Sequence, residues 1–253
     1  MFSLKGKVAL VTGSTKGIGK SIAEEMANAG AKVVISSRKA EACNAVAAEF
    51  AARGQEAMAL PCHVGNKAAC QAAVDAIIAQ WGGIDILVCN AASNPHFGPL
   101  ATASDDVFDK IMETNVKSVF WLANMVLPQM GERGGGAMII ISSIGALRGS
   151  TVLGLYGTSK AAEAGLARAL AVEWGPKNIR VNTIAPGLIK TDFAKALWSD
   201  EARRKSREAS TPMRRLGEPK DIGGVATFLA TEAGSFVTGQ MIVVDGGVTV
   251  SGS

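Results

Sequence analysis

Short apolar segments alternate with longer helix-like segments along almost the whole chain, and this alternation constrains the fold more than any other feature. Seven apolar segments have the length of strands: 8–11, 33–36, 57–60, 84–89, 137–142, 180–184 and 241–244. The segments between them are typical of helices: 17–29, 40–53, 67–81, 104–130, 156–174 and 220–230. Because the strands are apolar nearly throughout, they indicate a parallel sheet with helices on both faces. We therefore predict an α/β fold, with one doubly wound sheet of about seven strands in a single domain over 1–253.

The composition excludes several other classes of protein. A chain of 253 residues with 19% charged residues can bury a sizeable core. No apolar run approaches the roughly 18 residues of a membrane span, and Met1–Gly6 does not resemble a signal peptide, so we expect a cytoplasmic protein. The net charge of +4 is mild, and its densest cluster, 203–207, is more typical of a solvated helix face than of nucleic-acid binding.

The four cysteines do not have the spacing of metal ligands. They are Cys43, Cys62, Cys70 and Cys89, two in predicted helices and two at the ends of apolar segments. We expect reduced, mostly buried thiols and no metal site.

Residues that suit ligand binding follow the ends of the predicted strands. They are Gly13, Arg38, His63, Asn90, Ser143 and the pair Pro186-Gly187. In a doubly wound sheet the ligand crevice lies at the carboxyl ends of the strands.

Gly13, Gly17 and Gly19 form a Gly-x-x-x-Gly-x-Gly turn between a strand and a helix. The absent side chains let the backbone approach a pyrophosphate, and the helix N-terminus offers free amide donors.

The charge after the second strand predicts which dinucleotide binds. Enzymes that use NAD place an acid there to accept a hydrogen bond from the ribose 2′-hydroxyl. This chain has Ser36-Ser37-Arg38-Lys39 and no acid. Arg38 can bind a 2′-phosphate through paired hydrogen bonds, Ser37 can donate a hydroxyl, and Lys16 is expected to add a second cation. We therefore expect NADP(H).

Tyr156 and Lys160 are four residues apart in a predicted helix, so their side chains lie on one face. A free phenol has a pKa near ~10, and a nearby cation lowers that pKa by favouring the phenolate. Alone, such a pair is more typical of surface packing. Ser143, at the end of an apolar strand, has a hydroxyl that can donate to a substrate carbonyl oxygen.

Together with Asn115 and the turn Thr12–Gly19, these residues resemble the Asn-Ser-Tyr-Lys tetrad and cofactor loop of the short-chain dehydrogenase/reductase family. The resemblance extends from Lys7 to about Gly247. It implies a Rossmann-type fold and a nicotinamide cofactor, with Asn115, Ser143, Tyr156 and Lys160 as catalytic residues. It also implies that Asn115 lies at a helix distortion and holds a water in a proton relay to Lys160.

The resemblance extends to the other cofactor contacts. Asn90-Ala91-Ala92 matches a family element imperfectly, His63 stands where many relatives carry an Asp, and Ile189 and Thr191 are expected to hold the carboxamide. The full set of expected cofactor residues is Gly13, Ser14, Thr15, Lys16, Gly17, Ile18, Gly19, Ser37, Arg38, His63, Val64, Asn90, Ala91, Ala92, Tyr156, Lys160, Pro186, Gly187, Ile189 and Thr191.

A long segment between the sixth strand and the last helix, 188–218, is typical of a substrate-binding lid. Phe193, Leu197 and Trp198 form an apolar stripe there, which suits either a core or the cover of a hydrophobic substrate. The expected substrate contacts are Ser93, Ser143, Leu153, Tyr156, Leu188, Phe193, Leu197 and Trp198.

The predicted function is interconversion of a ketone or aldehyde with an alcohol. Several motifs, among them Cys62-His63-Val64 and 215–219, resemble the peroxisomal-type NADP-dependent retinal and carbonyl reductases. Sugar or polyol dehydrogenases and 3-oxoacyl-carrier-protein reductases remain alternatives, the latter because Arg133 and Lys177 could dock an acidic carrier. A dinucleotide-sensing regulatory protein is the rival from another class, but such proteins commonly lose the Tyr or the Lys. The resemblance also implies a homotetramer.

Overall fold

All seven strands lie in one parallel sheet, in the order β3-β2-β1-β4-β5-β6-β7. The structure is a computed structural model that describes residues 1–251. The strands are β1 (Val8–Thr12), β2 (Lys32–Ser36), β3 (Ala57–Ala59), β4 (Ile86–Cys89), β5 (Gly136–Ile141), β6 (Ile179–Pro186) and β7 (Met241–Val244). The strand order reverses between β1 and β4, which is where doubly wound sheets bind their ligands.

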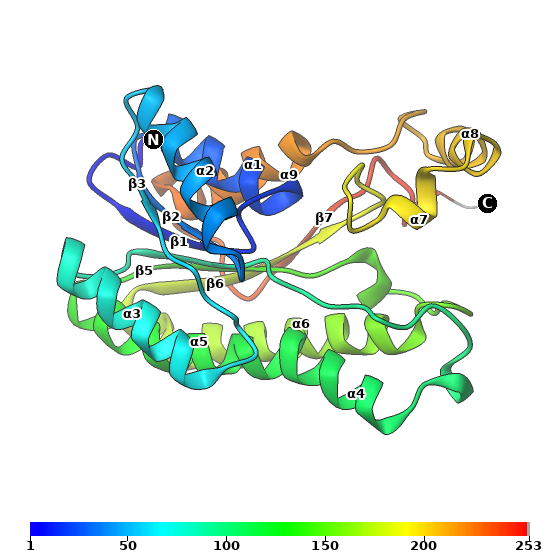
Figure 1. The fold of residues 1–253 in the computed structure, drawn as a ribbon, viewed down its shortest axis with the longest axis horizontal. Coiled ribbons are helices and arrows are strands. Elements are labelled where there is room, and N and C mark those ends of the chain that lie inside the picture. Colours follow the sequence, from blue (N-terminus) through cyan, green and yellow to red (C-terminus); the bar gives the residue numbers. More distant parts are fainter. Residues whose placement is uncertain (252–253) are drawn as a thin grey trace.

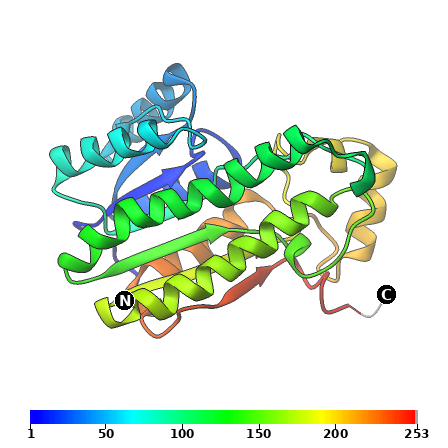
Figure 2. The ribbon, with the colours of Figure 1, turned by 90° about the horizontal axis from the view of Figure 1, so that it is seen from below.

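Helices cover both faces of the sheet, as the apolar strands require (Figure 1). They are α1 (Gly17–Asn28), α2 (Ala40–Ala52), α3 (Lys67–Trp81), α4 (Asp105–Met112), α5 (Ser118–Glu132), α6 (Gly154–Trp174), α7 (Lys195–Trp198), α8 (Glu201–Ser210) and α9 (Pro219–Ala230). The helices α1, α2 and α9 lie on one face. Figure 2 shows α3, α5 and α6 across the other face, with α5 and α6 side by side.

Two hydrophobic cores, one on each face, fix the helices to the sheet. One core joins strand residues such as Leu10 and Ile140 to α3, α5 and α6. The other joins residues such as Val11 and Ile139 to α1, α2 and α9. Successive residues of a strand point to opposite faces, so neighbouring residues of one strand enter different cores. The predicted α/β fold with about seven strands is confirmed.

Most strand ends lie within one residue of the prediction, and two ends differ by two residues for reasons that the contacts explain. β4 begins at Ile86 rather than at residue 84, because the Asp85 carboxylate accepts the Val8 N–H at 2.9 Å and so replaces a ladder bond. β6 extends to Pro186 because its last residues pair with β7. Asn182, polar yet buried, is satisfied by hydrogen bonds with Val237 and Gln240.

The predicted helix over 104–130 contains an irregularity that matters for the site. A π-helical turn, Glu113–Lys117, separates α4 from α5. Such single turns commonly occur at functional sites. This one carries Asn115, so the expected helix distortion is present.

Candidate active site

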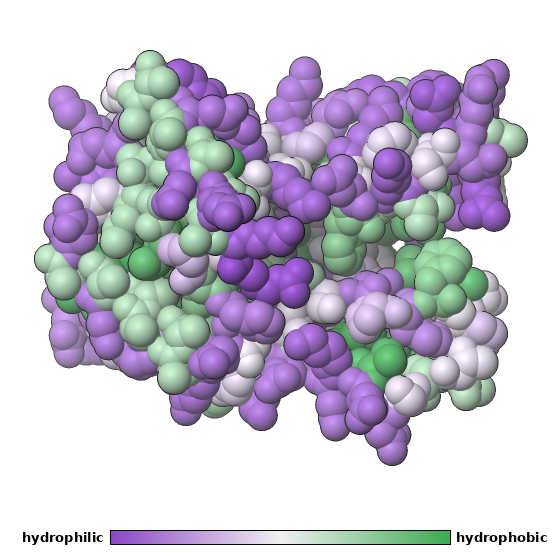
Figure 3. Space-filling view, in the orientation of Figure 1, coloured by the Kyte–Doolittle hydropathy of each residue, from purple (hydrophilic) through white to green (hydrophobic). Residues whose placement is uncertain are grey.

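A cavity of about 2240 Å³ opens at the carboxyl ends of the strands. Pockets for drug-sized ligands are commonly about 300–1,000 Å³, so this one has room for a dinucleotide and a substrate together. The space-filling view is hollowed between the segment that carries α7 and α8 and the layer below it (Figure 3). The cavity is lined by all of the expected site residues except Ser14, Asn115 and Trp198.

The glycine-rich turn after β1 forms the floor of the cavity. Gly13 and Gly17 have φ values of 68° and 56°, which favour glycine. Gly19 has an ordinary φ, but a Cβ there would lie under 3.0 Å from Gly13 O and Asn90 Nδ2. The first turn of α1 carries no acidic residue. The backbone is therefore open to close approach by an anion, and the free N–H groups of the helix N-terminus suit a pyrophosphate.

Thr12 and Asn90 join this turn to the one after β4. The Thr12 hydroxyl accepts hydrogen bonds from the backbone N–H of Asn90 at 3.0 Å and of Ala91 at 3.1 Å. The Asn90 amide donates to the carbonyls of Thr12 and Gly13. Thr12 was not among the predicted site residues, although a hydroxyl residue that ends an apolar strand before a glycine turn could have indicated this role.

Two residues of the turn have contacts that their place in the sequence did not indicate. Ser14 is fully buried, and its hydroxyl accepts the Ser36 N–H at 2.9 Å, so it fastens the turn to β2 instead of lining the cavity. Lys16 lines the cavity, but its ammonium lies 3.0 Å from the Asp192 carboxylate, on the segment after β6. Both side chains are exposed, and their ion pair joins the turn after β1 to the segment after β6.

The end of β2 places Ser37, Arg38 and Lys39 on the cavity wall, with Arg38 and Lys39 exposed. His63 lies on the wall beside them, and its Nδ1 accepts the Gly65 N–H at 3.0 Å. The histidine side chain is therefore held by its own loop.

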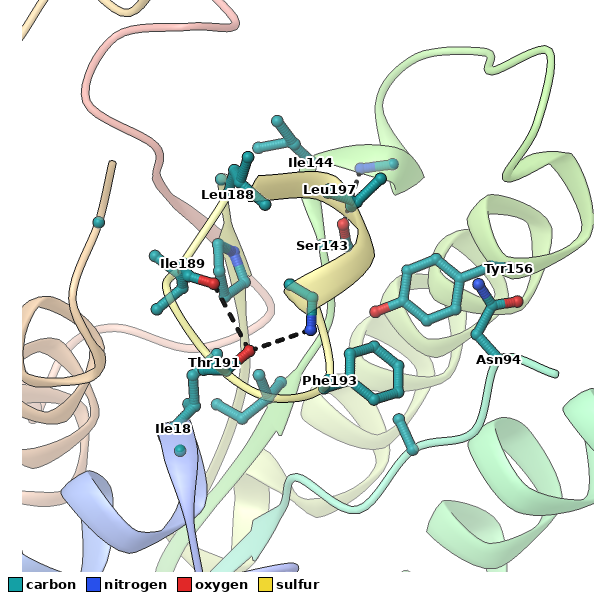
Figure 4. A pocket seen from close by; sticks show the side chains of 18 of the residues that line it. Ile18, Asn94, Ser143, Ile144, Tyr156, Leu188, Ile189, Thr191, Phe193 and Leu197 are labelled. Carbon is teal, nitrogen blue, oxygen red and sulfur yellow. Dashed lines mark hydrogen bonds between the residues drawn. The ribbon is translucent and has the colours of Figure 1, made fainter. Parts of the chain in front are cut away.

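Tyr156 and Lys160 lie together near the start of α6, as their spacing predicts. The Lys160 Nζ is 5.6 Å from the centre of the Tyr156 ring. The phenol hydroxyl points into the cavity, and the Phe193 ring lies against the tyrosine with 6.2 Å between ring centres (Figure 4). Burial raises the pKa of Tyr156; the Lys160 ammonium opposes that rise, as expected, but the Glu163 carboxylate adds to it, and the pKa stays above its ordinary value.

Lys160 is held by two acceptors deep in the protein. Its side chain is 2% exposed, and Nζ donates to Ile141 O at 2.9 Å and to Glu163 Oε1 at 2.7 Å. Glu163 was not among the residues predicted for the site. The available signal was its position three residues after Lys160, on the helix face that carries Tyr156 and Lys160.

The two serines that follow β5 have different tasks. The Ser142 hydroxyl is buried and donates to Lys160 O at 2.8 Å, which joins β5 to α6. Ser143 lines the cavity, and its hydroxyl accepts the Gly145 N–H at 3.0 Å. That hydroxyl keeps its own proton for donation toward a ligand.

Asn115 is fully buried behind the cavity wall. Its side-chain oxygen accepts the Ser93 N–H at 2.8 Å, and its amide donates to Ser93 O and to the Ser159 hydroxyl. It fastens the chain after β4 to α6. Within residues 1–251 no direct hydrogen bond joins Asn115 to Lys160, so a relay between them needs an intermediary.

The segment after β6 closes one side of the cavity. Ile189 is buried and forms a parallel bridge with Gly217, and the Thr191 hydroxyl lies within hydrogen-bonding distance of Ile189 O and Ala194 N (Figure 4). Phe193 and Leu197 line the cavity. Trp198 faces elsewhere and donates from Nε1 to Thr191 O at 3.1 Å, so it supports the segment and does not line the cavity.

Residues 13–249 match the family model described as enoyl-(acyl carrier protein) reductase. Dehydrogenase/reductase SDR family member 4 of Sus scrofa is 46% identical over 244 residues, which cover 96% of this chain and 88% of that protein. The human protein of the same name is 44% identical over the same lengths. This chain belongs to the short-chain dehydrogenase/reductase family. As a member, it is an oxidoreductase that uses a nicotinamide dinucleotide.

Solved structures of this family have the same fold. A gluconate 5-dehydrogenase from Burkholderia cenocepacia J2315, in complex with NADP and tartrate, is 35% identical with a TM-score of 0.95, covering 99% of this chain and 98% of that one. A 7α-hydroxysteroid dehydrogenase complexed with NADH and 7-oxo glycochenodeoxycholic acid is 40% identical with a TM-score of 0.93, covering 97% and 95%. Short-chain dehydrogenases of this fold therefore include both NADP and NADH complexes.

Proposed function

We propose that the chain is an NADP(H)-dependent oxidoreductase that interconverts a ketone or aldehyde with its alcohol. The observation that supports NADP is the charge at the end of β2, where Ser37, Arg38 and Lys39 line the cavity and none is an acid. A carboxylate there would repel a 2′-phosphate, whereas a guanidinium binds phosphate through charge-assisted hydrogen bonds. Asp192 partly offsets the charge of Lys16, so we expect Arg38 to contribute more to this preference than Lys16 does.

In the proposed reaction each side chain has one task. When bound, the nicotinamide cofactor supplies or accepts the hydride. Ser143 donates a hydrogen bond to the carbonyl oxygen, and Tyr156 donates the proton that completes the alcohol. Lys160 orients the ribose, and Asn115 orders the path by which Tyr156 regains a proton. The segment 188–218 acts as the substrate-binding lid.

Cofactor preference is tested by kcat/KM for NADPH and NADH with one carbonyl substrate. A charge-assisted hydrogen bond contributes about 1.5–3 kcal/mol, so one good contact implies a preference of roughly 10–150-fold for NADPH. We expect Arg38→Ala to erode this preference mainly through KM, and Ser37→Asp to favour NADH. Arg53→Ala, at the other end of α2, serves as the control and should leave the preference intact. Equal efficiency with both cofactors in the wild type would contradict the proposal.

A second candidate substrate class, sugar acids, is favoured by three arginines. Arg148 from the loop before α6 and Arg203 and Arg207 from α8 line the cavity and are exposed. A substrate carboxylate could pair with them. Turnover of gluconate-type sugar acids but not of neutral polyols of the same length would favour this class over simple carbonyl compounds such as diacetyl, aromatic ketones and retinal.

The carrier-protein and sensor alternatives have weaker support. Arg133, one of the two candidate docking residues, donates to Gly82 O and lies 3.2 Å from the Asp85 carboxylate, beside the start of β4 and so at the opposite end of the sheet from the cavity. A sensor would bind the dinucleotide without turnover. Absence of activity on carbonyls, alcohols and acetoacetyl thioesters, with cofactor binding intact, would replace the enzyme proposal with the sensor.

We also propose that the chain assembles as a homotetramer. Large apolar side chains stay exposed on the helices of one face: Phe108 on α4 is 47% exposed, Phe120 on α5 50% and Val172 on α6 82%. β7 forms an open edge of the sheet. Subunit contacts at these places would bury them. Light scattering at micromolar concentration tests the proposal, and a monomer would refute it.

A further inference from the structure

Glu163 is a buried acid in direct contact with Lys160. Both side chains are 2% exposed, and Glu163 Oε1 lies 2.7 Å from Lys160 Nζ. The second oxygen, Oε2, is also buried and has no hydrogen-bond partner within residues 1–251. Two buried positions that follow it on α6, Ala164 and Ala167, are small and apolar. A carboxylate here is costly, because burial of a charge is tolerated only when the charge is paired.

The contact with Glu163 changes both the free N–H donors of Lys160 and the net charge beside Tyr156. An ammonium has three N–H donors, and Ile141 O and Glu163 take two of them. One donor is left for the cavity. The carboxylate also offsets the positive charge of the lysine, so that a buried ion pair, and not an isolated cation, lies beside the phenol. An opposite charge nearby favours the phenolate, and an ion pair does so less than a lone ammonium.

We propose that Glu163 is a positioning residue that acts through Lys160 to keep Tyr156 in its protonated, proton-donating form as the pH rises. The proposal rests on the proposed function, in which Tyr156 is the general acid of carbonyl reduction. With Glu163 ionised, the acid form of Tyr156 persists to higher pH, and the reductive reaction keeps its proton donor there. With Glu163 neutral, Lys160 acts as a full cation and the phenol loses its proton more readily.

The titratable groups that face Glu163 support this direction of the effect on the pKa of Tyr156. From its own helix these are Lys160 and Tyr156, and from the sheet the Cys89 thiol at the end of β4. Burial raises the pKa of Cys89, so this thiol stays neutral and adds no charge. Burial raises the pKa of Glu163 to about 7, while Lys160 opposes that rise. Glu163 therefore changes charge near neutral pH. Lys160 stays protonated throughout that change, because its own pKa is raised. Burial lowers the pKa of Lys160, but the charges of Glu163 and Tyr156 outweigh burial.

A direct test is possible because Tyr156 is the only tyrosine of the chain. The near-ultraviolet absorbance of the phenolate therefore reports the ionisation of this one residue and needs no turnover, so the test is independent of the proposed reaction. We expect the wild-type midpoint above the ordinary value of about 10. In Glu163→Gln the midpoint should fall by roughly one pH unit. Glu173→Gln, the same substitution at an exposed position of α6, should not change it.

The kinetic test is the pH profile of kcat/KM for carbonyl reduction. Below about pH 6 Glu163 is largely neutral, so wild type and Glu163→Gln should have the same profile. Above about pH 8 the variant should lose activity first, with roughly tenfold lower kcat/KM on the alkaline limb. A role in folding alone would lower stability without separating the two profiles.

A second variant, Glu163→Leu, tests the same point without a polar side chain. Glu163→Leu fills the site with apolar atoms and should lower the midpoint as the glutamine does, which covers the case in which Glu163→Gln does not fold. An unchanged midpoint in a folded variant, or a wild-type midpoint well below 10 in the native protein, shows that Glu163 does not keep Tyr156 protonated.

Discussion

Gly19→Ala tests how closely the glycine-rich turn after β1 packs against the turn after β4. Gly19 lies in the first turn of α1 with an ordinary helical φ, so alanine by itself suits the backbone. Alanine is favoured over glycine inside a helix by about 1 kcal/mol. From helix propensity alone, the substitution should stabilise the protein.

The surroundings of Gly19 reverse that expectation. The added methyl would lie under 3.0 Å from Gly13 O and from Asn90 Nδ2, the two atoms of a hydrogen bond that joins the turns after β1 and β4. Overpacking of this kind costs about 1–3 kcal/mol. Loss of the two hydrogen bonds from the Asn90 amide, to Gly13 and Thr12, costs about 0.5–1.5 kcal/mol each. With the helix gain subtracted, we expect a net loss of about 3 kcal/mol in the free energy of unfolding.

The assay pairs urea unfolding with titration of the dinucleotide. Since the turn must shift, its N–H groups no longer converge on one anion, and we expect cofactor affinity to fall at least about tenfold. The matched control is Gly224→Ala in α9, where an added Cβ would meet nothing within 4 Å. That variant should gain up to about 1 kcal/mol and bind cofactor normally. A Gly19→Ala protein with wild-type affinity, or with the stability gain of the control, would refute the packing argument.

Three further predictions concern the tyrosine, the lid and the buried acid. Tyr156→Phe keeps the ring and its packing but loses the proton, so turnover should fall about 10²–10⁴-fold with cofactor binding nearly intact; more than a third of the wild-type rate would refute the general-acid role. Trypsin should cut near Arg203-Arg204-Lys205 faster without cofactor than with it, since Ile189 and Thr191 are proposed to anchor the lid to the nicotinamide; equal rates would contradict this. The pKa of Glu163 is raised by burial to about 7 from 4.5, so its contribution to stability is fully present below pH 4.5 and is lost as the pH rises through 7. Unfolding of the wild type should therefore become easier over that range, by on the order of 3 kcal/mol, and a Glu163→Gln protein with the same dependence would show that other groups cause it.

The sequence by itself determined the architecture and the location of the site. Apolar runs bounded by glycines specify strands and helices locally, and the boundaries of α3 and β7 agree with prediction at both ends. Because parallel strands bring their carboxyl ends to one edge, residues far apart in the chain, such as Gly13, Asn90 and Ser143, were predicted to meet there, and they do. Helical spacing likewise predicted that Tyr156 and Lys160 share a face.

Only the tertiary structure decided what each polar side chain pairs with. Ser14 binds the backbone of β2, Lys16 pairs with Asp192 across the cavity, and Trp198 donates to Thr191, although their neighbours in sequence line the cavity. A hydrogen-bond partner on another element depends on the packing distance and direction of that element, which local periodicity does not contain. Glu163 shows the limit most clearly. Its spacing from Lys160 permits a contact, but an exposed ion pair at that spacing contributes little to stability. The pair is buried between α6 and the sheet, where water screens its charges less. Because of this burial, we expect one carboxylate to affect the pKa of Tyr156.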